Sequence, residues 1–279
     1  MKPWNLAGVR FLKRFDTIGA NLDKKFDHNN LTLAYEEYGN GENTLVFLHG
    51  LGSTGEVWKN QVDQYQEKYN IICVDLLGFG RSSKELKPED ALNSNVEVLS
   101  KFLSTLRKPW LIFGHSWSGS ILSRIDFGSL KMARGIGFLD CMFIDEHAQN
   151  SFQTWGSSML EKSDADLKVA AKEWYLGLCG NKEDSSTNTA VKSLLGSDLR
   201  WIFQTAVQVP LTPTPKVANL PVLICEADQF FGNVWARSFK AHISNAKSVL
   251  LNNANHFFFL TDPKKFHEAV TPFLETAFK

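Results

Sequence analysis

The sequence has no surplus of charge of either sign, because 30 lysine and arginine residues balance 30 aspartate and glutamate residues. Surfaces that bind nucleic acids are usually strongly basic, so we expect no nucleic-acid partner. No apolar run approaches the length of a membrane span, and the first residues lack the apolar core of a secretory signal. A membrane partner is therefore not favoured, and the oligomeric state is left open.

Cysteine is scarce, and the four cysteines are scattered without a C-x-x-C pair. Such pairs are typical of zinc sites and thiol redox centres. Isolated histidines and aspartates do not form a metal cluster either, so we expect neither a metal nor another cofactor. Cys73 and Cys225 lie in apolar segments, where cysteine packs as a small hydrophobic residue. This usage predicts a reducing, cytoplasmic location.

What is present is the composition of one globular domain: 279 residues, 43% hydrophobic and 22% charged. From residue 44 onward, short apolar segments alternate with amphipathic ones. This alternation predicts a mostly parallel sheet with helices on both faces. The expected strands are residues 44–48, 70–75, 109–113, 135–140, 221–227 and 247–251. The expected helices are residues 55–68, 95–106, 118–128, 233–243 and 262–278.

Two regions lie outside this alternation. Residues 23–28 and 31–38 predict a β-hairpin that turns at Asn29 and Asn30. Residues 1–22 form an N-terminal amphipathic segment, whose apolar side chains between residues 3 and 18 share one helical face. We expect that face to pack on the domain, and a membrane-surface helix is the alternative.

Residues 143–217 interrupt the alternation after the sixth expected strand, when the two hairpin strands are included in the count. Residues 164–178 and 189–207 have helical patterns, and three prolines stiffen the return to the sheet. We interpret this region as a helical cap. The core then comprises residues 23–142 and 218–279.

The segment Gly114–Gly119, with the sequence GHSWSG, joins the apolar strand 109–113 to a helical segment that begins near residue 121. A serine between small residues at such a junction is typical of a nucleophile elbow, which exposes the Ser116 hydroxyl at the start of the helix. The alternative is that Ser116 is only a helix N-cap. Ser118 stands where glycine is usual, and we expect its hydroxyl to bond a nearby helical carbonyl.

Further motifs follow in a fixed order. A His-Gly loop begins at His49, a D-x-x-G-x-G-x-S turn begins at Asp75, and Asp228 and His256 each follow an apolar strand. With the serine elbow, these motifs resemble those of the α/β-hydrolase superfamily over nearly the whole chain. The resemblance implies an α/β-hydrolase fold, a mostly parallel sheet with helices on both faces and a helical cap inserted after the sixth strand.

The resemblance also implies a catalytic triad of Ser116, Asp228 and His256, in the chain order of this family. Asp140, at the end of the sixth strand, is the rival acid. The backbone N–H groups of Leu51 and Trp117 are expected to form the oxyanion hole. His49 and His115 are expected to buttress loops through hydrogen bonds.

The pocket is expected to be aromatic, with no accompanying cluster of cationic residues. Its candidate lining residues are Phe143, Trp155, Trp174, Phe230 and Phe257. The function predicted is hydrolysis of a small-molecule carboxylic ester with an apolar or aromatic acyl group, through an acyl-enzyme on Ser116. The same triad would also suit a C–C bond hydrolase, a lactonase, a thioesterase or a cofactor-free haloperoxidase. The alternative outside catalysis is a ligand receptor that turns over slowly.

Overall fold

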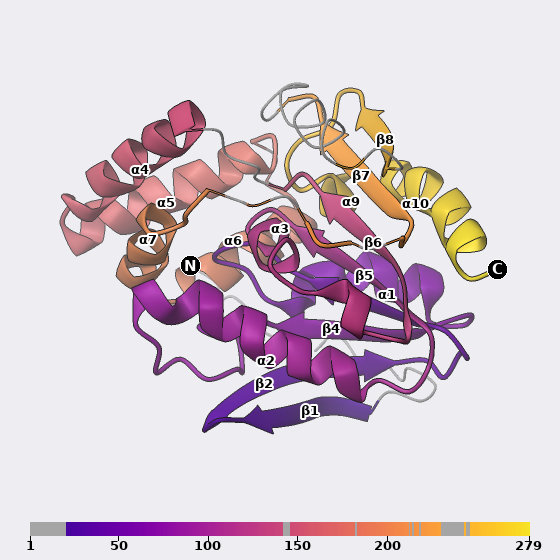
Figure 1. Cartoon of the computed structure of the whole chain (residues 1–279). Coiled ribbons are helices and arrows are strands. Elements are labelled where there is room, and N and C mark those ends of the chain that lie inside the picture. Colours follow the sequence, from indigo (N-terminus) through magenta and orange to yellow (C-terminus); the bar gives the residue numbers. More distant parts are fainter. Residues whose placement is uncertain are drawn as a thin grey trace, which may run out of the picture.

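The computed structural model describes residues 21–141, 146–181, 183–211, 213, 215–217, 219–229, 243 and 246–279. Their strands form one sheet in the order β1-β2-β4-β3-β5-β6-β7-β8 (Figure 1). The strands are β1 (Asn21–His28), β2 (Leu31–Tyr38), β3 (Thr44–Leu48), β4 (Asn70–Asp75), β5 (Trp110–His115), β6 (Ala133–Leu139), β7 (Val222–Ala227) and β8 (Ala246–Leu251). From β4 to β8 every neighbouring pair is parallel, whereas β1 and β2 add an antiparallel edge.

The hairpin turns at Asn29 and Asn30, as expected, and both residues have positive φ angles, 48° and 62°. Asparagine tolerates this region better than most residues, and two such residues in succession match the right-handed twist of a hairpin. The hairpin prediction and the six other predicted strands are confirmed, with boundary shifts of at most two residues.

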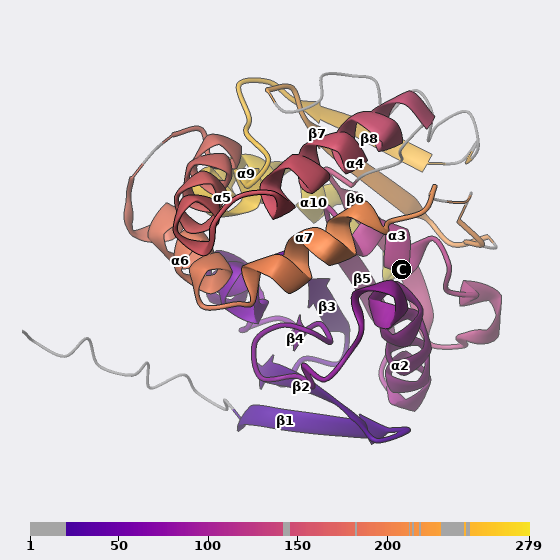
Figure 2. The ribbon, with the colours of Figure 1, turned by 90° about the vertical axis from the view of Figure 1, so that its left-hand side faces the viewer.

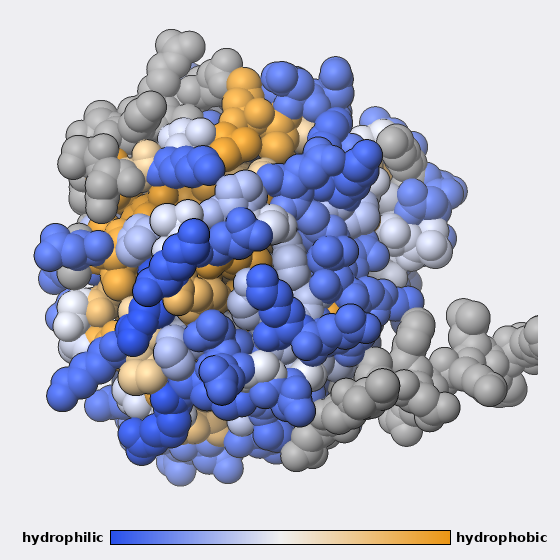
Figure 3. Space-filling view, turned by 90° about the vertical axis from the view of Figure 1, so that its right-hand side faces the viewer, coloured by the Kyte–Doolittle hydropathy of each residue, from blue (hydrophilic) through white to orange (hydrophobic). Residues whose placement is uncertain are grey.

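Helices cover both faces of the sheet. The helices outside the cap are η1 (Gly55–Trp58), α1 (Lys59–Tyr65), η2 (Pro88–Asp90), α2 (Ala91–Thr105), α3 (Ser118–Leu122), η3 (Phe127–Ser129), α9 (Phe258–Thr261) and α10 (Pro263–Ala277). Figures 1 and 2 show α2 and α3 on one face and α1 on the other, where α10 packs beside it. The outer surface on the α10 side is mainly hydrophilic (Figure 3), whereas Phe266, Val270 and Phe273 of α10 are buried. Strands β3, β4 and β5 are buried along their whole length, so the core lies on both sides of them.

Four further helices follow β6 and precede β7, and they form the helical cap that faces the viewer in Figure 2. They are α4 (Glu146–Leu160), α5 (Asp164–Leu178), α6 (Ser185–Leu195) and α7 (Leu199–Val207). The α/β architecture with a cap after the sixth strand is thus confirmed. Within the described residues, no helix is both long enough and apolar enough to cross a bilayer.

Three details of the helix prediction were wrong. The expected helix 189–207 is two helices, because the chain breaks at Gly196 and restarts where the Asp198 carboxylate accepts a hydrogen bond from the Trp201 N–H at 3.1 Å. The helix after the elbow ends at Leu122, and α4 was not predicted. The expected helix 233–243 and the N-terminal segment 1–22 fall almost entirely outside the described residues.

Candidate active site

Ser116 lies directly after β5 and just before α3, in a strained turn. Its φ angle is 53°, in the left-handed region that non-glycine residues rarely adopt. The turn is also crowded: a Cβ atom at Gly114 would lie 2.6 Å from Leu122 Cδ1, and one at Gly119 would lie 2.4 Å from Cys141 Cβ. A side chain at Gly119 would collide with Cys141, and one at Gly114 would displace the Leu122 side chain. The local geometry is that of a nucleophile elbow rather than of an ordinary helix cap.

Ser118 contributes a contact that differs from the one expected. Its hydroxyl donates a hydrogen bond of 2.5 Å to the carbonyl of His49, in the loop after β3, and not to a helical carbonyl. The side chain is fully buried. Ser118 thus joins the start of α3 to the His-Gly loop, a link that glycine at this position could not make.

His256 follows β8 and is 3% exposed. Its Nδ1 lies 2.6 Å from Oδ2 of Asp140, which directly follows β6 and is equally buried. His256 also lines the same cavity as Ser116. The structure therefore brings together Ser116, His256 and Asp140 from the ends of β5, β8 and β6.

Burial governs the protonation of this group. It lowers the pKa of His256 to about 3, so the imidazole is a neutral base at pH 7. Burial also raises the pKa of Asp140, although the Ala227 N–H, 3.1 Å from Oδ1, acts in the opposite direction. Two donors, this N–H and the His256 Nδ1–H, face the Asp140 oxygens and favour its ionised form.

The prediction that Asp228 is the partner of His256 is wrong. The Asp228 carboxylate accepts hydrogen bonds from the backbone N–H groups of Asn253 at 2.8 Å and Ala254 at 3.0 Å. These bonds lower its pKa and hold the turn that precedes His256. The cause is strand pairing: β7 pairs with β8 up to Ala227 opposite Leu251, so Asp228 meets the turn beyond β8.

The His-Gly loop lies against the nucleophile. A Cβ atom at Gly50 would be 3.0 Å from Ser116 Cβ, so any side chain there would press on the serine. The backbone N–H groups of Leu51 and Trp117 make no hydrogen bond within the described part of the chain, and both residues line the cavity with Ser116. Both groups can therefore donate to a molecule bound in the cavity, and their role as an oxyanion hole stays a prediction.

The two other histidines of the site support its loops, as predicted. The Nε2 of His49 accepts a hydrogen bond from the Leu76 N–H at 3.0 Å, so the proton is on Nδ1, which donates to the Gly50 carbonyl at 2.7 Å. The Nε2 of His115 lies 3.0 Å from the backbone carbonyl of His256, and the two rings are 4.4 Å apart. Burial lowers the pKa of both His49 and His115, so both stay neutral.

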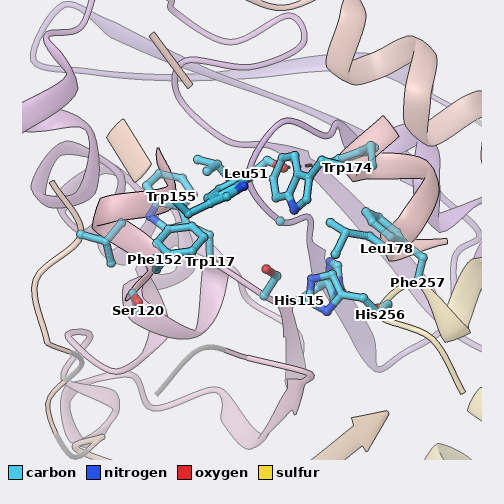
Figure 4. A pocket seen from close by; sticks show the side chains of 14 residues that line it. Leu51, His115, Trp117, Ser120, Phe152, Trp155, Trp174, Leu178, His256 and Phe257 are labelled. Atoms are coloured by element: carbon cyan, nitrogen blue, oxygen red, sulfur yellow. Dashed lines mark hydrogen bonds between the residues drawn. The ribbon is translucent and has the colours of Figure 1, made fainter. Parts of the chain in front are cut away.

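A cavity of about 220 Å³ opens over Ser116, between the core and the cap. Figure 4 shows Phe152 and Trp155 on one side of it and His115 and His256 on the other. The described residues that line it include no Lys, Arg, Asp or Glu: they are Gly50, Leu51, His115, Ser116, Trp117, Ser120, Phe152, Trp155, Trp174, Tyr175, Leu178, Val209, His256 and Phe257. Trp155, Trp174 and Phe257 were predicted, whereas Phe143 and Phe230 lie outside the described residues.

Among the hydrogen bonds that join the cap to the core in the described residues, three that sequence reasoning missed run from a side chain to a backbone carbonyl. The Tyr175 hydroxyl donates to the Leu51 carbonyl at 3.0 Å, and the Asn255 amide donates to the Cys179 carbonyl at 3.0 Å. The Trp201 indole N–H donates to the Leu86 carbonyl at 2.7 Å. In each of these bonds the acceptor is a backbone carbonyl. Every residue has one, so the sequence does not indicate the partner. The four cysteines are buried and unpaired, and the described residues contain no cluster suited to a metal ion.

The sequence matches the alpha/beta hydrolase family over residues 45–269. It is 23% identical over 258 residues to (E)-2-((N-methylformamido)methylene)succinate hydrolase of Acinetobacter baylyi, covering 89% of this chain and 96% of that one. It is 22% identical over 260 residues to a soluble epoxide hydrolase of Corynebacterium sp., covering 82% of this chain and 88% of that one. An esterase structure from Rhodococcus sp. superposes with a TM-score of 0.75 at 17% identity, covering 92% of this chain and 99% of that one, which shows the shared fold.

Proposed function

Because the chain belongs to the alpha/beta hydrolase family, we propose that it cleaves carboxylic esters through an acyl-enzyme on Ser116. The observation that carries this proposal is the joint placement of Ser116 and His256 on one cavity, with Asp140 2.6 Å behind the imidazole. A serine and a histidine on one cavity, with an aspartate behind the imidazole, form the arrangement that activates a hydroxyl for acyl transfer. Asp140 therefore takes the role that the sequence assigned to Asp228.

In the first half-reaction the Ser116 oxygen attacks the ester carbonyl, and its proton passes to Nε2 of His256. The Nδ1–H of His256 stays on the ring and donates to the Asp140 carboxylate, which stabilises the imidazolium. The N–H groups of Leu51 and Trp117 bind the oxyanion. When the tetrahedral intermediate collapses, the bond to the alcohol oxygen breaks, and the alcohol leaves with the proton of His256.

In the second half-reaction a water molecule gives its proton to His256 and its oxygen to the acyl carbon. A second tetrahedral intermediate forms, and its collapse returns the proton to the Ser116 oxygen. The products are a carboxylic acid, which ionises in solution, and the free enzyme. No cofactor enters this scheme.

The cavity lining supports an uncharged, apolar or aromatic acyl group. The rings of Trp155 and Trp174 lie 4.8 Å apart in a tilted arrangement and both pack against Phe203, so the cap supplies an aromatic wall. Binding a succinate, as the name of the relative from Acinetobacter implies, would call for a cationic side chain to pair with each carboxylate. Such a group is absent from the described lining residues, so we infer a different substrate class.

The test combines labelling with turnover. We expect a fluorophosphonate to label Ser116 and not the Ser116→Ala variant, and p-nitrophenyl benzoate and butyrate to be hydrolysed faster than a p-nitrophenyl hemisuccinate. Preference for the hemisuccinate would contradict the substrate class. Labelling without turnover of any ester would favour the slow receptor. The similarity over 258 residues to the succinate-derivative hydrolase favours cleavage of a bond other than an ester as the second candidate.

A further inference from the structure

Three consecutive carbonyls of the oxyanion loop are held by three separate parts of the molecule. Ser118 of α3 binds the carbonyl of His49. The carbonyl of Gly50 accepts from the His49 ring at 2.7 Å and from the Ser53 N–H at 3.3 Å. The carbonyl of Leu51 accepts from the hydroxyl of Tyr175, which belongs to the cap.

These bonds fix the direction of the Leu51 N–H. A trans peptide is planar, with its carbonyl and its N–H pointing in opposite directions. The Gly50 carbonyl and the Leu51 N–H belong to the same peptide. The groups that bind this carbonyl therefore also fix the direction of the Leu51 N–H. The bond from Tyr175 holds the next peptide plane, so both planes that flank Leu51 are fixed, one by the core and one by the cap.

The cap also packs tightly against this loop. Gly52 has a φ angle of 74°, and a Cβ atom there would lie 2.6 Å from Leu194 Cδ1 of α6 and 3.7 Å from the Tyr175 ring. Tyr175 is 1% exposed, and burial raises its pKa, so its hydroxyl keeps the proton that it donates. A buried hydroxyl needs a partner, and the Leu51 carbonyl supplies it.

We propose that Tyr175 is a positioning residue through which the cap aligns the oxyanion loop, so that the oxyanion hole is complete only while α5 is docked. This inference rests on the proposed acyl transfer. Loss of the hydroxyl frees the Leu51 carbonyl and lets the 51–52 peptide rotate. Leu51 is then held only through its 50–51 peptide, so its N–H can tilt away from the negative oxygen of the transition state. A neutral ligand, which does not need this donor, still fits the cavity.

The variant Tyr175→Phe removes only the hydroxyl. We expect kcat to fall about tenfold, the effect of one aligned hydrogen bond, with KM changed less than about twofold. The decisive measurement compares two ligands of similar size. Phenylboronic acid forms a tetrahedral anion when its boron accepts the Ser116 oxygen, whereas benzamide binds as a neutral molecule. Tyr175→Phe should weaken the boronic acid about tenfold and benzamide by less than about twofold.

Trp201→Phe is the matched control, because it removes a different cap-to-core hydrogen bond, the one to Leu86. Trp201 is not among the residues that line the cavity, so this variant should change both affinities by the same factor. The inference is overturned if Tyr175→Phe keeps the boronic acid affinity, or weakens both ligands equally as the control does. A wild-type protein that neither binds the boronic acid nor is labelled at Ser116 would instead overturn the proposed function, and with it this inference.

Discussion

The carboxyl ends of β6 and β7 each carry an aspartate, and the two side chains have opposite surroundings. Asp140, after β6, is 4% exposed and meets the imidazole of His256. Asp228, after β7, is only half-buried and meets backbone N–H groups. β6 is the neighbour of β5, and the Ser116 N–H donates to the Leu139 carbonyl at 3.0 Å, so the end of β6 is beside the nucleophile.

The position of a strand in the sheet, more than the local sequence around an aspartate, decides which aspartate meets His256. His256 lies beyond β8, at the sheet edge, and still reaches the end of β6. The turn at Asn253, with a φ angle of 54°, redirects the chain, and Asp228 holds that turn. The two aspartates thus have different roles: Asp140 faces the imidazole, and Asp228 holds the loop that carries His256.

Among the substitutions that test these two roles, we expect the largest loss of activity from a change of Asp140. Asp140→Asn keeps the shape of the side chain but removes the charge behind His256 and no longer enforces the correct tautomer. We expect kcat for a p-nitrophenyl ester to fall roughly 10⁴-fold, as in serine proteases, with the circular dichroism spectrum preserved. A variant that retains more than a tenth of the wild-type kcat would show that Asp140 is not the acid.

The double variant Asp140→Asn/Asp228→Asn tests whether Asp228 serves as a reserve acid. Independent residues give multiplicative effects, so the double variant should lose only the small additional factor of Asp228→Asn alone. The measurement is residual kcat/KM in all four combinations. If Asp228→Asn removes the residual activity of Asp140→Asn while leaving the wild type almost unchanged, the two carboxylates are coupled and the division of roles fails.

The pH dependence of kcat/KM is a second way to distinguish the roles of Asp140 and Asp228. The active imidazole is neutral, and burial lowers the pKa of His256, so the acidic limb of kcat/KM should lie below the ordinary value of 6.5. Activity then rises with pH through the folded-state pKa and is constant at neutral pH. Asp140→Asn removes a negative charge that stabilises the imidazolium, and so it should move the limb to still lower pH.

Asp228→Asn should leave that limb in place, because Asp228 has no contact with His256 among the described residues. A shift of the limb in Asp228→Asn and not in Asp140→Asn would reverse the assignment. The ratio of the two shifts is therefore informative even if both variants are poorly active.

The part of the site that the sequence predicted is the part encoded locally. The elbow at Ser116 lies within a single turn, as do Leu51 and Trp117 beside the cavity, and His256 follows a recognisable strand, so the sequence pattern indicates each of them. The local sequence could not show whether Asp140 or Asp228 is the partner of His256, because both follow apolar strands and only the strand order distinguishes them. Tyr175 resembled any buried residue of an amphipathic helix, since its partner is a backbone carbonyl. The break of helix 189–207, by contrast, had a visible signal in Gly196 and Asp198.

The smallest expected effect is that of Asp228→Asn on the wild-type background, and it concerns stability more than chemistry. The backbone N–H groups of Asn253 and Ala254 lower the pKa of Asp228 below its ordinary 3.8. A carboxylate whose pKa is lowered on folding stabilises the protein above its unfolded pKa, and that contribution is lost as the pH falls through the folded-state value. We therefore expect kcat within about threefold of the wild type and a slightly lower melting temperature at pH 7. The difference in melting temperature should shrink below about pH 4, and salt should reduce it, because the carboxylate is partly exposed to solvent. A difference that persists unchanged at pH 3 would show that the carboxylate charge does not hold the turn, and that the loop depends on the shape of the side chain alone.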